Sequence, residues 1–145
     1  MVHSVAIALI LIVASSGVSA AAEFEVDMLN KGPDGVMVFE PPLTKVAVGD
    51  TVHFVAKDKG HNAQTIPGML PDGAEPVNGQ ISQDLTVTFT VPGVYGIRCV
   101  PHFALGMVAL VEVGAGPPPN LAAAQETQIP PLAKKRLDPL WAQLQ

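Results

Sequence analysis

A short segment late in the chain brings together three kinds of side chain that bind soft metal ions. The segment reads CVPHFALGM and holds Cys99, His102 and Met107 in the pattern C-x2-H-x4-M. A thiolate and an imidazole three residues apart, at the end of a strand and in the loop that leaves it, can reach one ion. The same loop can bring a thioether back toward that ion. Such a site still needs a second imidazole from another segment.

His61 is the favoured source of that second imidazole. His3 lies in an N-terminal segment that we expect to be removed. His53 occupies the polar side of an alternating strand pattern, so its ring should face solvent. His61 instead follows Gly60 at a strand end, where glycine permits an unusual backbone turn.

Copper suits this donor set better than zinc. Two neutral imidazoles and one thiolate in a near-trigonal arrangement, with a weak thioether above, are typical of a blue-copper electron-transfer site. Structural zinc sites prefer sets richer in cysteine, and methionine suits the softer Cu(I). Taken singly, each residue has a structural alternative as a solvated histidine, an inert buried thiol or a packed methionine. Their joint occurrence at loop ends favours copper ligation.

The N-terminal residues predict export. An apolar run from Val5 to Val13 precedes small residues and Val18-Ser19-Ala20, which resembles a cleavage site. The rival interpretation is a membrane anchor, but the run is shorter than the roughly 20 residues that a bilayer requires. We therefore expect a signal peptide at 1–21, a single domain at 22–145 with no membrane span, and a periplasmic location.

Composition narrows the class of protein further. The chain has 145 residues, one cysteine and a formal net charge of −5. The length fits one domain, and the acidic balance argues against a nucleic-acid partner. An unpaired cysteine in an exported protein forms an intermolecular disulfide, is buried and inert, or is held as a thiolate by a metal.

Hydrophobic alternation predicts a mainly β fold. We expect strands at 24–29, 36–39, 84–91, 94–99 and 107–113, and two more within 44–56 that are joined by a hairpin or bend at Gly49-Asp50. Residues 57–83 are loop-like. Short strands with frequent turns, continuing to about residue 114, favour an antiparallel Greek-key sandwich or barrel.

Two helices are expected in the C-terminal segment, over about 120–144. Asn120 is a candidate N-cap for the first, and Pro131 suits the first turn of the second. Pro139 predicts a kink or a split into two short pieces. An apolar stripe that should dock on the sheet consists of Leu137, Leu140, Trp141 and Leu144.

These features together resemble the cupredoxins, the family of type I blue copper proteins, and among them the pseudoazurins. Plastocyanins share C-x2-H-x4-M, whereas the long gap between His61 and Cys99, the Cys-x-Pro-His form and the two terminal helices narrow the choice. The resemblance covers roughly residues 22–145. It implies one copper ion bound by His61, Cys99, His102 and Met107. It also implies that Asn62 joins the two ligand-bearing segments by hydrogen bonds.

The resemblance further implies a one-electron carrier rather than an enzyme. Redox partner proteins would dock near His102, with a copper-containing nitrite reductase as a candidate acceptor, and the carrier should be a monomer. Lys31, Lys59 and Arg98 would either form a basic docking ring or be ordinary solvated charges.

Other classes remain as alternatives. A copper chaperone or storage protein would want an open, exchangeable site, and a structural module would bind no metal. A multicopper oxidase would need His-x-His pairs, which the chain lacks.

Overall fold

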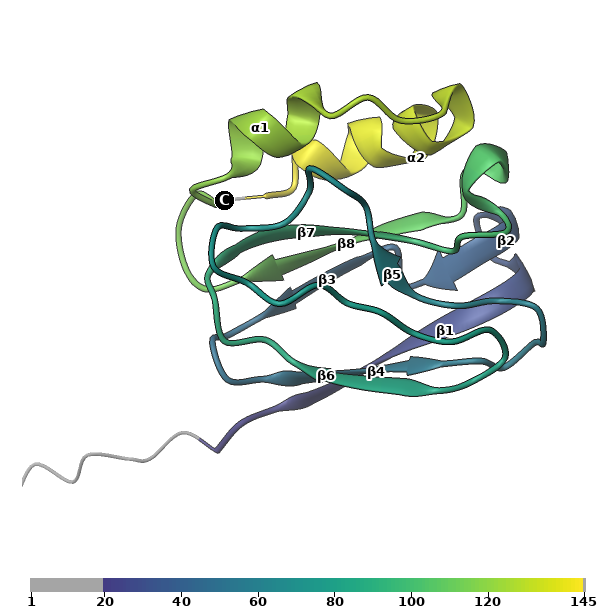
Figure 1. The fold of residues 1–145 in the computed structure, drawn as a ribbon, viewed down its shortest axis with the longest axis horizontal. Coiled ribbons are helices and arrows are strands. Elements are labelled where there is room, and N and C mark those ends of the chain that lie inside the picture. Colours follow the sequence, from purple (N-terminus) through teal and green to yellow (C-terminus); the bar gives the residue numbers. More distant parts are fainter. Residues whose placement is uncertain (1–19, 145) are drawn as a thin grey trace, which may run out of the picture.

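The computed structural model describes residues 20–144 and shows two packed β-sheets with two helices on one side (Figure 1). The strands are β1 (Glu23–Gly32), β2 (Gly35–Glu40), β3 (Leu43–Val46), β4 (Thr51–Val55), β5 (Gln64–Thr65), β6 (Leu85–Thr88), β7 (Gly93–Arg98) and β8 (Val108–Val113). A 3-10 turn η1 (Phe103–Leu105) precedes β8, and α1 (Leu121–Glu126) and α2 (Pro131–Trp141) follow it. The expected mainly β fold with two C-terminal helices is confirmed. Residues 1–19 of the expected signal peptide lie outside the described part.

Both sheets are mixed, which corrects the expectation of purely antiparallel pairing. One sheet has the order β2-β1-β4-β6 and the other β3-β8-β7-β5. β1 pairs parallel with β4, and β3 pairs parallel with β8. The Gly49-Asp50 segment, in which Gly49 takes a φ of 95°, connects β3 with β4. Because β3 and β4 belong to different sheets, this segment is a bend between layers and not a hairpin.

The main core fills the space between the two sheets. Phe39 and Phe54, from the first sheet, are buried and meet edge to face with ring centroids 6.4 Å apart. Ile97 from β7 packs in the same cluster, and so do Cys99 and Met107. The predicted site residues are therefore continuous with the best-packed part of the molecule.

The helices cover the outer face of the sheet that contains β7 and β8 (Figure 1). Leu137 and Leu140 of α2 are buried in a cluster with Leu110 of β8, which confirms that the predicted stripe docks on the sheet. All six residues of β8 are consequently buried. No helix within residues 20–144 is long and apolar enough to cross a membrane.

Two details of the helices differ from what the sequence predicts. α2 is one helix with Pro139 inside it, so the expected split into two short pieces is wrong. Pro139 and Lys135, whose carbonyl loses its helical donor, are both exposed residues. Asn120 stands at the N-cap position of α1, as predicted, but its side chain makes no capping hydrogen bond. Its amide instead accepts a hydrogen bond from Val94 N at 2.9 Å and donates one to Val94 O at 2.8 Å, which ties the start of α1 to β7.

Candidate metal centre

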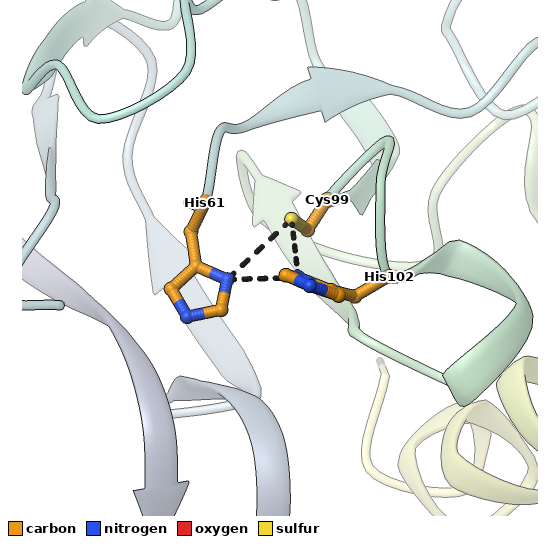
Figure 2. A group of neighbouring side chains, drawn as sticks. All are labelled: His61, Cys99 and His102. Atoms are coloured by element: carbon orange, nitrogen blue, oxygen red, sulfur yellow. Dashed lines mark hydrogen bonds between the residues drawn. The ribbon is translucent and has the colours of Figure 1, made fainter. Parts of the chain in front are cut away.

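Three of the four predicted ligands meet at one end of the sandwich (Figure 2). His61 lies in the loop after β4, Cys99 directly follows β7, and His102 precedes η1. The Cys99 Sγ lies 3.7 Å from His61 Nδ1 and 3.5 Å from His102 Nδ1, and the two nitrogens are 3.0 Å apart. Cys99 and His61 are buried, whereas His102 is half-buried.

The segment from Cys99 to Met107 closes on itself through backbone hydrogen bonds. The Cys99 N–H donates to Met107 O at 3.0 Å, and the Met107 N–H donates to His102 O at 3.1 Å. Gly106 takes the left-handed conformation, with a φ of 84°, which favours glycine at this position. Met107 is fully buried as the loop returns to β8. The segment that holds Cys99, His102 and Met107 therefore folds as one compact turn.

Asn62 forms the link that was predicted for it. Its Oδ1 accepts a hydrogen bond from Val100 N at 2.9 Å, and its Nδ2 donates to Gly79 O at 3.0 Å. The first bond joins the His61 segment to the Cys99 segment. Since Asn62 is also buried, this connection is shielded from competing water.

Asn30 is a residue of the site that sequence reasoning missed. The Nε2–H of His61 donates to Asn30 Oδ1, with 2.9 Å between the atoms. This bond places the ring proton on Nε2 and leaves the Nδ1 lone pair directed toward Cys99. Asn30 lies near the end of β1 just before a turn, and no pattern in the sequence distinguishes it from a turn residue.

The surroundings favour the neutral form of the His61 imidazole, and a thiolate at Cys99 would need a compensating positive charge. Burial raises the pKa of the Cys99 thiol, and backbone N–H groups of Asn62 and His102 offset this only in part. Burial also lowers the pKa of His61, the nearby His102 lowers it further, and Asp58 opposes both effects. A cation next to the sulfur would supply the missing compensation.

The donor set fits a metal ion. The three ligand atoms lie within 4.8 Å of one another, as expected for donors that share one ion at bond lengths of about 2.0–2.3 Å. Two imidazole nitrogens and one thiolate match the trigonal donor set of blue-copper proteins. These residues could therefore hold copper without rearrangement of the main chain.

The rival ligand and the three predicted docking charges are not part of the cluster of His61, Cys99 and His102. The His53 Nδ1 contacts Thr86 Oγ1 at 2.9 Å, on a strand face remote from Cys99, which supports the choice of His61. Arg98 stacks over the Phe103 ring at 5.3 Å and has a buried Nε, so it is not a simple solvated charge. Lys31 and Lys59, by contrast, are exposed.

Comparison with known proteins agrees with this geometry. Residues 26–114 match the model of the copper binding proteins of the plastocyanin/azurin family. A pseudoazurin from Methylorubrum extorquens is 51% identical over 127 residues, which cover 88% of this chain and 85% of the relative. The chain belongs to the pseudoazurins, within the cupredoxin family. A pseudoazurin from Paracoccus pantotrophus is 44% identical to this chain, and the match covers 98% of this chain and 97% of that relative.

Solved structures of pseudoazurins share the fold. The crystal structure of pseudoazurin from Methylobacterium extorquens AM1 matches with a TM-score of 0.82 and 51% identity, over 85% of this chain and 99% of that one. A pseudoazurin from Hyphomicrobium denitrificans matches with a TM-score of 0.79 and 43% identity, over 85% and 98%. Like other members of the family, this pseudoazurin binds one copper ion and carries electrons, and it is not an enzyme.

Proposed function

We propose that the protein is a periplasmic one-electron shuttle whose copper is bound by His61, Cys99, His102 and Met107. The observation that carries the proposal is the convergence of two imidazole Nδ1 atoms on the only cysteine sulfur of the chain. Met107 would supply a fourth, weaker thioether donor, because it is fully buried and its main chain is hydrogen-bonded to both Cys99 and His102.

The side chains around the site keep the donors in place while the charge changes. Copper, when bound, supplies the Cu(II)/Cu(I) couple. Asn30 fixes the His61 ring, and Asn62 fixes the spacing between the two ligand segments. Because these hydrogen bonds hold the ligand side chains and segments in place, a change of oxidation state would require little movement of the ligands. A tightly held site of this kind also favours a carrier over an exchangeable copper chaperone or storage protein.

Electron exchange would take place through the His102 ring. His102 is half-buried, and its neighbours Val100 and Leu105 are 44% and 50% exposed. A small apolar surface around a metal-bound ring suits the brief contacts of redox partners. The family resemblance points to a copper-containing nitrite reductase as acceptor. Exposed Lys31 and Lys59 offer positive charge for an acidic partner, while the overall charge of −5 disfavours nucleic acid.

The proposed location in the cell follows from the N-terminal segment. A signal peptide at 1–21 would direct export, and residues 22–145 would act as a monomer in the periplasm. Mass spectrometry of the periplasmic fraction tests this, because a chain that starts near residue 22 is expected there. An uncleaved chain in the membrane fraction would contradict it.

The decisive experiment is a visible and EPR spectrum of the copper-loaded domain with its copper content. One copper per chain and an intense blue thiolate band that bleaches reversibly on reduction are expected. Cys99→Ser should abolish the band, and so should His61→Gln, while the matched variant His53→Gln should retain it. A colourless protein that yields Cu(I) to a chelator would instead indicate a chaperone or storage protein.

A further inference from the structure

The C-terminal helix reaches the ligand loop through one side chain, Arg136 of α2. Its Nη1 donates a hydrogen bond to Gly106 O at 2.8 Å and another to Met37 O at 2.5 Å. Its Nη2 donates to Val36 O at 2.7 Å. One guanidinium therefore joins α2, β2 and the residue that immediately precedes Met107.

The peptide group between Gly106 and Met107 is held at both ends. Its carbonyl oxygen accepts the bond from Arg136, and its N–H donates to His102 O at 3.1 Å. A methyl group at Gly106 would lie only 2.9 Å from Leu132 O, so α2 also packs closely against this turn. The plane of this peptide, and hence the starting point of the Met107 side chain, depends on α2.

The surroundings of Arg136 favour a fixed position of its guanidinium relative to the carbonyls that it binds. The side chain is half-buried, and Met37, which accepts one of its bonds, takes a positive φ of 52° that non-glycine residues seldom adopt. A planar guanidinium can hold several carbonyls at set angles, which a lysine ammonium cannot reproduce. The exposed neighbour Lys135 carries the same charge one residue away.

We propose that Arg136 is a positioning residue for Met107, acting on the copper site through the Gly106–Met107 peptide. The inference rests on the proposed role of Met107 as weak axial ligand. A thioether in this role would bind copper weakly, so its distance from the ion would follow the position of the main chain, and such a ligand tunes the reduction potential of blue-copper sites. α2 thus contributes to the properties of the metal centre as well as to the stability of the fold.

The test compares Arg136→Met with Lys135→Met, which removes the same charge without removing the bond to Gly106. Arg136→Met is expected to shift the reduction potential and the EPR copper hyperfine splitting. Lys135→Met should leave both close to those of the parent protein. Equal values for the two variants would overturn the proposal. If Arg136→Met does not fold, Arg136→Lys serves instead, and it should give a smaller shift of the same sign.

A double-mutant cycle separates positioning from a general structural or charge effect. In a Met107→Leu background, which has no thioether, Arg136→Met should produce little further shift of the potential. A shift as large as in the parent background would show that Arg136 does not act through Met107.

A measurement without copper keeps this proposal distinct from the proposed function. In the copper-free protein, Arg136→Met should accelerate hydrogen exchange of the Met107 amide by roughly five- to thirtyfold. Lys135→Met should not. Faster exchange in a protein that never turns blue would retain the positioning role and reject the electron carrier. Unchanged exchange in a blue protein would reject the positioning role alone.

Discussion

His61 and His102 present the same ring atom to the same sulfur from opposite environments. His61 is 0% exposed, and its second nitrogen is bonded to Asn30. His102 is half-buried and follows the exposed residues Val100 and Pro101. The two rings lie edge to face, with centroids 4.8 Å apart (Figure 2). One ring thus anchors the centre in the core, and the other connects it with the surface.

The largest effect should come from removing each ring in turn and adding imidazole. In copper-loaded His102→Gly, free imidazole should enter from solvent and restore the blue band. In His61→Gly the gap is closed inside the core, so the band should stay absent at the same imidazole concentration. Titrations followed by visible absorption make the comparison. Equal restoration in both variants would contradict the distinction between a buried and a surface ring.

The hydrogen bond that holds the His61 ring can be removed without replacing a copper ligand. Asn30→Leu removes the acceptor for His61 Nε2 while keeping a similar volume, and should lower Cu(II) affinity by about 10–100-fold. Asn30→Asp retains an acceptor oxygen and should stay closer to the parent. Competition with a chelator of known affinity measures the difference. If the Leu variant binds copper as tightly as the Asp variant, the anchoring role is wrong.

A smaller effect is expected at the surface near His102. Leu105→Glu places a carboxylate on the proposed docking face. Self-exchange of electrons between two copies should then slow by about tenfold, because like charges would oppose each other across the contact. The matched variant Val48→Glu changes a residue that is 52% exposed near Gly114, at the other end of the sandwich.

NMR line broadening in mixtures of oxidised and reduced protein gives the self-exchange rate. The visible spectrum should be unchanged in both variants. Slowing by Val48→Glu to the same degree would mean that the effect reports net charge and not the docking face.

What the sequence revealed about the site depended on how local each contact is. Cys99, His102 and Met107 lie in one turn, so their spacing alone predicted that they belong together. The choice of His61 over His53 required only the alternation of one strand. Asn30 and Arg136 escaped notice because their contacts join segments distant in the chain, and neither residue type stands out in its local pattern.

In the fold, too, local features could be predicted from the sequence and contacts between distant segments could not. Alternation identified the strands of the core, and the helical stripe identified the face of α2 that packs on β8. Alternation does not specify pairing partners, so the parallel pairs β1·β4 and β3·β8 were not foreseen. Asn120 has the residue type of a helix cap, yet tertiary contacts with Val94 use its amide instead.

X-ray absorption at the copper edge is the most direct test of the central claim, that a thiolate and two imidazoles share one copper ion. For the copper-loaded protein we expect one short copper–sulfur distance together with two imidazole nitrogens. The short sulfur contribution should vanish in Cys99→Ser. A first shell made only of nitrogen and oxygen in the parent protein would contradict the assignment.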